Sequence, residues 1–267
     1  DVLDANNVEY KILWWNRLSE NILGNRKNKM IEFFRKGRVG GRWKNLVGLI
    51  FWNFYIFFTL VKNFRKIDVV QAIDLDCAAS AFLFDKIFRK KIIFDVYDKY
   101  SDAKSIFGIS GSIASLIENA LINNSDTSIL VDECRYEQHK IKKKDNILVI
   151  ENVPMSLDLS KSIKNAGSKK FLNIGYFGAL EPVHRGLEDL VKVVLECEHL
   201  ILTIAGYGEL SQYLDEVSSK FPEKIKFHGM LNSSQGLALM ESSDIYIGMY
   251  YKTNRNHYWA APNKYFE

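Results

Sequence analysis

Paired cysteines are missing from this sequence. Its 267 residues include three cysteines, Cys77, Cys134 and Cys197, and they form no CxxC pair. This distribution argues against a disulfide scaffold and a cysteine-based zinc site, and it fits a reducing compartment. The chain also lacks the composition of a disordered protein, because 47% of its residues are hydrophobic and 25% are charged. We therefore expect one large globular domain or two smaller ones.

An apolar run long enough to cross a membrane is also missing. The stretch Leu46–Val61 is uncharged but has only 16 residues, whereas a spanning helix needs about 20. Its aromatic residues are spread along it instead of gathering at two ends, and a strand pattern follows directly. We interpret it as a buried helix packed on a sheet. A helix lying in a membrane interface and a true span are the alternatives.

The start of the sequence shows neither an initiator Met nor a charged-then-apolar signal peptide. The chain opens with DVLDANNVEY and closes with APNKYFE, inside the pattern of a helix start. We expect a longer natural protein, in which the first strand of one domain and the end of the other lie outside this sequence.

Charge is distributed unevenly. The formal net charge is 36 − 32 = +4, with 24 basic and 19 acidic residues in 1–155 and 12 and 13 in 156–267. Residues 26–44 hold eight basic side chains against Glu32 alone. Such a stretch can face nucleic acid, anionic lipid or a phosphorylated substrate, or can simply be a solvated surface. No RNP, KH or zinc-finger pattern accompanies it, so we expect no nucleic-acid partner.

Short apolar runs alternate with helical patterns through the first half of the chain. Strands are predicted at 8–14, 67–73, 91–96, 126–131 and 147–150, and helices at 17–35, 43–64, 77–88, 112–123 and 133–142. The run at 67–73 is typical of a strand buried on both faces. This alternation predicts a parallel, doubly wound α/β sheet.

A polar stretch rich in Lys and Ser, 156–170, interrupts the alternation and is typical of a linker. The pattern then restarts, with strands at 171–177, 200–205, 224–228 and 244–249 and helices at 187–198, 209–219 and 233–242. We predict two Rossmann-like domains, 1–155 and 171–267. Their ligands would bind at the carboxyl ends of the strands, in a cleft between the two sheets.

Glycines directly follow the strands of the second domain: Gly178, Gly206, Gly208 and Gly229. Glycine lets backbone approach a ligand, and a following helix N-terminus favours phosphate, although tight turns alone would also need glycine. The third glycine of a dinucleotide fingerprint is missing after Gly208. No acidic residue ends the following strand to hold a ribose, which argues against an NAD site.

In their order and spacing these segments resemble the retaining glycosyltransferases of family 4, also called group 1, which have the GT-B fold. The resemblance is strongest in IGYFGALEPVHRGLEDLVKVV, LTIAGYGEL, IKFHGMLNSSQGLALMESSDIYIG and APNKYFE. The first half carries it more weakly, in IDVVQAIDLDCAASAFL, SDTSILVDECRYEQ and ILVIENVPM. The resemblance implies transfer of a sugar from a nucleotide-diphosphate sugar with retained configuration, and no metal or other cofactor.

The resemblance also implies a donor site. The matching positions are Arg185, Lys264 and Gly178 for the diphosphate, Glu267 for the ribose, Met230 and Leu231 for the base, and Gly206 and Gly208 for the glycine loop. A diphosphate leaving group needs cationic donors as its charge builds up. Each position also has an ordinary explanation, as an exposed loop residue, a helix-start residue or a packing contact.

Some positions depart from the family pattern. Ala179 stands where a basic residue often follows the first glycine, and Trp259 replaces the first of two glutamates, so the sugar is left open. Tyr97 stands where many members have His, and Asp98 follows it. Either residue is a candidate to bind the sugar or orient the acceptor, or merely caps a loop. We expect no metal site, since three histidines are isolated from possible co-ligands in the sequence: His184, His228 and His257.

Together these features predict a hexosyltransferase-type retaining enzyme, cytoplasmic or peripheral on the inner face of the cell membrane. The first domain would bind a saccharide or lipid-linked saccharide, and residues 26–64 would face an anionic membrane surface, as in capsule, O-antigen or exopolysaccharide assembly. The alternatives are a non-catalytic glycosyltransferase-like subunit of an assembly complex and a sugar-nucleotide epimerase of the same fold.

Overall fold

A computed structural model of the chain describes residues 2–17, 29–36, 46–153, 170–252 and 255–260. The chain divides into two compact units, Asp1–Ile150 (unit 1) and Glu151–Glu267 (unit 2), and each is described by itself. Nearly all of the predicted linker, 156–170, lies outside the described residues.

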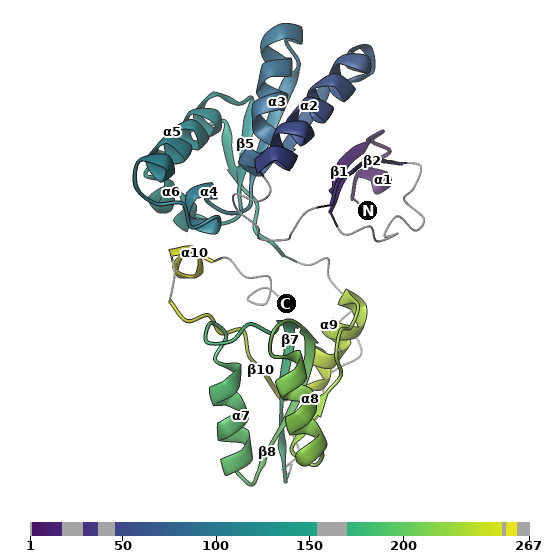
Figure 1. Cartoon of the computed structure of the whole chain (residues 1–267), viewed down its shortest axis with the longest axis vertical. Helices are drawn as coiled ribbons and strands as arrows, with labels where there is room; N and C mark the ends of the chain where they lie inside the picture. The colour runs from purple at the N-terminus through teal and green to yellow at the C-terminus, as the bar shows by residue number, and fades with distance from the viewer. Residues whose placement is uncertain (1, 18–28, 37–45, 154–169, 253–254, 261–267) are drawn as a thin grey trace. The chain divides into compact units, whose positions relative to one another are not determined.

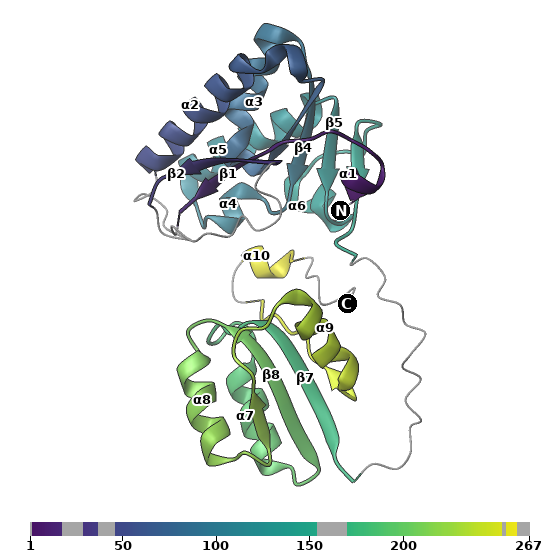
Figure 2. The same ribbon diagram turned by 90° about the vertical axis from the view of Figure 1, so that its right-hand side faces the viewer.

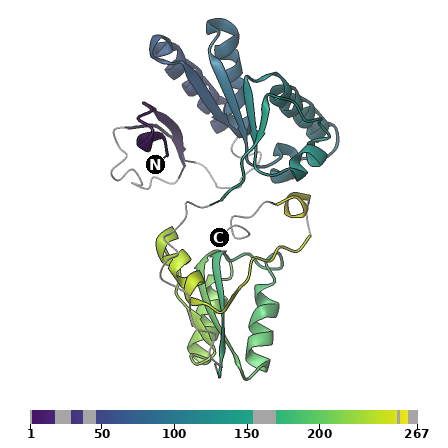
Figure 3. The same cartoon turned by 180° about the vertical axis from the view of Figure 1, so that it is seen from behind.

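Unit 1 is built on a four-stranded parallel sheet. Its strands stand in the order β3 (Val69–Ile73), β4 (Lys91–Val96), β5 (Thr127–Leu130) and β6 (Ile147–Val149). The connecting helices are α3 (Asp74–Phe88), α4 (Tyr100–Ala103), α5 (Gly108–Asn124) and α6 (Cys134–His139). Helix α3 covers one side of the sheet and α5 the other (Figure 1, and from behind in Figure 3). Phe94, Ile122 and Leu130 are completely buried between these layers.

A separate pair of strands begins unit 1, after the short helix α1 (Val2–Ala5). Strands β1 (Ile12–Asn16) and β2 (Met30–Phe34) pair in parallel. Strand β2 corrects the helix predicted over 17–35, because the apolar and aromatic residues of MIEFF are also suited to a pleated, half-buried strand. Residues 18–28 of that predicted helix lie outside the described chain.

Helix α2 (Leu46–Lys62) packs on both the two-stranded sheet and α3. Its Trp52 ring lies 6.2 Å from Trp15 and 5.6 Å from Phe33, measured between ring centroids. A short 3-10 turn, η3 (Phe64–Lys66), follows. The helix is confirmed, but the prediction that it is buried is wrong for one face. Five large apolar side chains there are 49–65% exposed: Val47, Ile50, Phe51, Phe54 and Phe58. Within the described chain, helices fall short of the length and apolarity that a bilayer crossing requires.

Strand β3 corrects a second expectation. It pairs with β4 on one side only and stands at the edge of the sheet among the described strands. Val69 is 46% exposed and Ile73 is 41% exposed, so this strand is not buried on both faces. An apolar run alone does not distinguish a central strand from an edge strand.

Unit 2 is a second four-stranded parallel sheet. Its strands are β7 (Leu172–Ala179), β8 (Leu200–Tyr207), β9 (Ile225–Phe227) and β10 (Ile245–Tyr246), in the order β10-β7-β8-β9. Its helices are α7 (Leu187–Glu196), α8 (Ser211–Lys220), α9 (Ser233–Ser242) and α10 (Arg255–Tyr258). Helices α7 and α8 share one core on the sheet, and α9 packs on the other side (Figure 2). The strand predicted at 244–249 is only two residues long.

The strand order of unit 2 changes direction at β7. The chain passes from β7 to β8 and β9 on one side, then returns to β10 on the other side of β7. The carboxyl ends of β7 and β10 therefore lie side by side at the point where the strand order reverses. Such a topological switch point is where open parallel sheets form a ligand crevice.

Candidate functional site

Arg185 lies at the switch point of unit 2, in the loop between β7 and α7. Its guanidinium carbon lies 3.8 Å from the ring centroid of Tyr250, which follows β10. The segment after β10 is tied to this loop, because the Tyr251 amide donates to the His184 carbonyl at 2.9 Å and its hydroxyl donates to Asp189 at 2.9 Å. The fold thus brings together two segments more than 60 residues apart in sequence.

The Arg185 side chain is buried, but only some of its N–H groups donate hydrogen bonds. Arg185 is 8% exposed, and its Nε donates to the Glu181 carboxylate at 2.8 Å. Its Nη1 is buried without a hydrogen-bond partner among the described residues. Burial lowers the pKa of Arg185, but Tyr250 and Glu181 raise it above its usual value, so the group is a fixed cation. A buried cation with an unused N–H is suited to an anionic ligand.

Two histidines of this region correct the expectation that they are isolated. The rings of His184 and His257 lie edge to face with centroids 5.0 Å apart, and Tyr250 lies 5.6 Å from His257. Burial, followed by the charges of His184 and Arg185, lowers the pKa of His257. In the part of the chain that the structure describes, no three His, Cys, Asp or Glu side chains gather as a metal site. The absence of a metal stays a prediction.

The glycines at the strand ends of unit 2 have a structural reason of their own. Gly206 and Gly208 have φ angles of 149° and 150°. A Cβ on Gly206 would overlap the carbonyl oxygen of Gly178, and one on Gly208 would lie 2.5 Å from the Leu180 oxygen. These glycines therefore let the ends of β7 and β8 approach each other. The diphosphate role of Gly178 stays a prediction.

The other donor-site positions are placed only in part. Met230 lies in the β9–α9 loop and is 76% exposed, while Leu231 packs on the cluster around Leu239 and Met240. Lys264 and Glu267 lie outside the described residues. The predicted base and ribose contacts therefore stay predictions.

Tyr97 and Asp98 directly follow β4, at the carboxyl edge of the unit 1 sheet. Tyr97 is 50% exposed, and its amide donates to the Asp74 carboxylate at 3.0 Å. Asp98 accepts from Nη2 of the buried Arg135 at 2.9 Å. The structure thus places both predicted residues on one edge, where a ligand can reach Tyr97.

Sequence reasoning missed two carboxylates on this edge, Asp74 and Asp76, in the first turn of α3. Burial raises the pKa of Asp74 to about 6, partly offset by the Tyr97 amide, and nearby Asp98 and Asp76 raise it further. Asp74 has a left-handed backbone, with φ of 52°. Their position directly after an apolar strand was the available signal, because carboxyl ends of parallel strands carry ligand sites.

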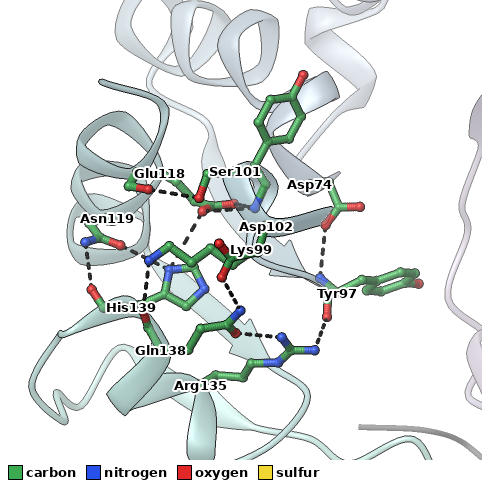
Figure 4. A network of polar contacts seen from close by, with 12 residues as sticks. Asp74, Tyr97, Lys99, Ser101, Asp102, Glu118, Asn119, Arg135, Gln138 and His139 are labelled. Carbon is green, nitrogen blue, oxygen red and sulfur yellow. Dashed lines mark hydrogen bonds and ion pairs between the residues drawn. The ribbon is translucent and has the colours of Figure 1, made fainter. Parts of the chain in front are cut away.

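A buried polar network lies behind Tyr97 (Figure 4). Arg135 donates to the Tyr97 carbonyl at 3.0 Å and to Gln138 at 2.6 Å, and Gln138 donates to Asp102 at 2.9 Å. Glu118 accepts from the Tyr100 amide at 3.0 Å. These groups come from α4, α5, α6 and the loop after β4, so sequence spacing gave no sign that they meet.

Two members of the network are held in their neutral forms. Burial raises the pKa of Glu118 to about 8. Burial, together with the charges of Lys99 and Arg135, lowers the pKa of His139 to about 3. At neutral pH Glu118 is therefore mostly protonated and His139 is neutral.

No protein-family model matches the sequence. A curated protein, an uncharacterised glycosyltransferase of Methanocaldococcus jannaschii, is 23% identical over 241 residues and covers 78% of this chain. The chain spans 57% of the length of that relative.

Two solved structures are similar to the chain over most of its length. HepE of Anabaena, in complex with UDP and glucose, has a TM-score of 0.51 at 15% identity, covering 86% of this chain and 71% of its own. The lipopolysaccharide outer core galactosyltransferase WaaB, in its apo form, has a TM-score of 0.54 at 15% identity, covering 85% and 60%. At such identities the likeness shows the fold, and the predicted GT-B class with Rossmann-like parallel sheets is confirmed.

Proposed function

We propose that this protein is a glycosyltransferase that moves a sugar from a nucleotide-diphosphate sugar to an acceptor hydroxyl. The observation that carries the proposal is Arg185, a buried cation at the switch point of unit 2 whose Nη1 has no hydrogen-bond partner among the described residues. Helix α7 begins two residues later, at Leu187, and the positive end of its dipole adds to the attraction for phosphate. The GT-B fold and the description of the archaeal relative support this function.

The donor would be held by unit 2, with Arg185, Lys264 and Gly178 at the diphosphate. Glu267 would accept hydrogen bonds from the ribose, and the segment at Met230 and Leu231 would contact the base. UDP is the first nucleotide to test, because the similar HepE structure contains UDP and glucose. The resemblance to family 4 supports hexosyl transfer with retention.

Retention requires one bond to form on the face from which the other leaves. The bond between the anomeric carbon and the diphosphate oxygen breaks, and the acceptor oxygen bonds to the same face of that carbon. The acceptor proton passes to the leaving diphosphate, whose added charge Arg185 stabilises. Tyr97 or Asp98 would orient the acceptor in unit 1.

The decisive experiment is thermal stability of the protein against UDP, GDP, ADP, dTDP and CMP. Bound nucleotide raises Tm in proportion to ln(1 + [L]/Kd). We expect a shift with one diphosphate, weakened on the order of 10- to 100-fold in Kd by Arg185→Ala, since one charge-assisted hydrogen bond is lost. Glu267→Ala should weaken binding too, and Arg65→Ala in unit 1 is the matched control. If no nucleotide shifts a folded sample, the non-catalytic alternative replaces this proposal.

A membrane surface is the second partner that we propose. Helices α2 and α3 run in the same direction, because Asn53 donates to the Asp76 carbonyl and Phe64, just beyond α2, packs on Phe88 at 5.1 Å. Their last turns and the loops after them therefore lie at the same end of this helix pair and carry six cations. These cations are Lys62, Arg65, Lys66, Lys86, Arg89 and Lys90. Exposed aromatic side chains beside cations are suited to an anionic bilayer.

The lipid-facing role of α2 supports a lipid-linked saccharide as the acceptor, as in assembly of a bacterial surface polysaccharide, with the enzyme peripheral on the inner face of the membrane. Flotation with vesicles of phosphatidylcholine, with or without phosphatidylserine, tests it. We expect binding only to the anionic vesicles, weakened by salt and lost in Phe54→Ser/Phe58→Ser. Leu116→Ser is the matched control, because Leu116 is 70% exposed on α5, which carries no basic residue. Equal binding to neutral vesicles, or no effect of the α2 changes, would contradict the proposal.

A further inference from the structure

The buried polar network of unit 1 is costly for a small core. Its six members are at most 8% exposed: Lys99, Asp102, Glu118, Arg135, Gln138 and His139. Removing charges from water costs several kcal/mol per ion, and apolar side chains of similar volume often give equal or greater stability. The network is therefore poorly explained by stability alone.

Its contacts converge on one short segment, residues 97–102, which leads from β4 into α4. Arg135 binds the Tyr97 carbonyl and the Asp98 carboxylate through the same Nη2 atom, at 3.0 and 2.9 Å. Gln138 donates to Asp102, and Lys99 donates to the Gln138 carbonyl at 2.8 Å. Helix α6 thus holds both ends of the segment, while Glu118 of α5 holds its middle through the Tyr100 amide.

Arg135 occupies the centre of this arrangement. It is 1% exposed, whereas the Asp98 side chain is 41% exposed. One oxygen of Asp98 is fixed by the buried guanidinium, so the carboxylate is restrained in direction while it remains open to solvent. A lysine at position 135 would keep the charge but lose the planar fork that reaches Gln138 and the Tyr97–Asp98 pair at once.

We propose that Arg135 is a positioning residue for sugar transfer: with Gln138 behind it, it fixes the 97–102 segment so that Tyr97 and Asp98 face the acceptor. This inference rests on the proposed function. It assigns Arg135 no contact with substrate. A positioning role differs from a purely structural one in its kinetic effect. Loss of Arg135 should lower turnover more than donor affinity, because the proposed donor site lies in unit 2.

The experiment compares Arg135→Lys, Asp98→Asn and the double variant with a destabilised control, Ser128→Ala. Ser128 is fully buried in unit 1 and donates to the Ile122 carbonyl at 2.9 Å, with no bond to residues 97–102 among its hydrogen bonds. Hydrogen exchange measures the segment directly. The probes for activity are UDP-glucose as donor and octyl β-D-glucoside as acceptor.

We expect Arg135→Lys to speed amide exchange at residues 97–102 by on the order of tenfold relative to Ser128→Ala, the value of one charge-assisted hydrogen bond. The kcat should fall by a similar factor, with KM for UDP-glucose unchanged, and the effects of Arg135→Lys and Asp98→Asn should not add. Asp98→Asn, a change at a partly exposed residue, keeps the test valid if Arg135→Lys folds poorly.

Two results would overturn the proposal. One is unchanged exchange at residues 97–102 in Arg135→Lys. The other is a loss of kcat no larger than in Ser128→Ala. If the wild-type protein binds no nucleotide and turns over no donor, the proposed function fails instead, and the exchange data alone decide whether Arg135 fixes the segment.

Discussion

The two units share one architecture but place their polar groups differently. Among the described residues, Arg185 is the single buried polar or charged side chain of unit 2, whereas unit 1 buries a whole network that includes Arg135, Lys99 and Glu118. Unit 2 thus keeps an apolar core and one buried cation at the carboxyl edge of its sheet. Unit 1 has buried polar side chains behind the carboxyl edge of its sheet.

The described sheets also differ in strand order. Unit 2 has a switch point beside β7, and Arg185 lies in the loop that follows this strand. The described sheet of unit 1 runs in simple sequence, from β3 to β6, without such a point. The loop after β4 is held there by hydrogen bonds from Arg135 and to Glu118. In unit 2 the strand order positions Arg185, whereas in unit 1 side-chain hydrogen bonds position Tyr97 and Asp98.

The largest expected effect is a loss of stability that is confined to unit 2. Gly206→Ala would force a Cβ against the Gly178 carbonyl, and φ of 149° adds strain. We expect a loss of about 3 kcal/mol in the free energy of unfolding. Gly229→Ala is the matched control, because its φ is also positive but no atom lies within 4 Å, so the loss should be about 1 kcal/mol. Hydrogen exchange in β7 and β8 against β4 and β5 measures each unit, and equal losses in the two variants would refute the packing argument.

A smaller expected effect is a pH-dependent stability of unit 1, which contains Glu118 and His139. The pKa of Glu118 is about 8 in the folded state, so that state holds a proton the unfolded chain releases, and stability falls as pH rises from about 4.5 to 8. His139, with a pKa of about 3, acts oppositely, and its contribution is lost as pH falls below 6.5. The two slopes cancel between about pH 4.5 and 6.5.

Unit 1 should therefore lose about 2 kcal/mol between pH 6.5 and 8. Glu118→Gln should abolish that loss, because its amide does not ionise. Urea unfolding followed by tryptophan fluorescence is suitable, since four of the five tryptophans precede residue 60. An unchanged slope in Glu118→Gln would show that another group controls the pH dependence.

The smallest expected effect concerns Tyr250, whose ring lies against Arg185 in unit 2. Tyr250→Leu removes the ring beneath Arg185, a contact worth about 0.5–2 kcal/mol, so the Kd for UDP should rise by roughly 3- to 30-fold. Tyr250→Phe keeps the ring and should stay near the wild-type value. Isothermal titration with UDP measures both. Equal Kd values for Leu and Phe would mean that the ring does not orient Arg185.

Much of the fold could be predicted because most of its strands show as short hydrophobic runs in the sequence. The prediction for β4 matches residue for residue, and α9 matches too. Strand β2 was missed, since MIEFF also fits a helical pattern when its pairing with β1 is unknown. The exposure of β3 and of one face of α2 was missed for the same reason: a hydrophobic run shows that a side chain can be buried, not which neighbour covers it.

The sequence predicted those residues of the candidate site that follow directly on a strand pattern. Arg185, Tyr97 and Asp98 follow strands that the pattern predicts, and the structure finds them at carboxyl edges. Three contacts of the candidate site join residues that are 37 to 73 positions apart in the sequence. They are Arg185 with Tyr250, His184 with His257, and Asp98 with Arg135. No local pattern carries such pairs.

The sequence by itself determined the alternation of strands and helices, and hence two parallel α/β units, because backbone propensity and hydrophobic period act over a few residues. The tertiary structure decided the strand order that puts Arg185 at a switch point, and the burial that leaves its Nη1 without a partner in the described part of the chain. It also decided which polar side chains meet behind Tyr97. Burial and pairing depend on distant segments packing together, and the charge of a group such as Glu118 follows from that packing, not from its neighbours in the chain.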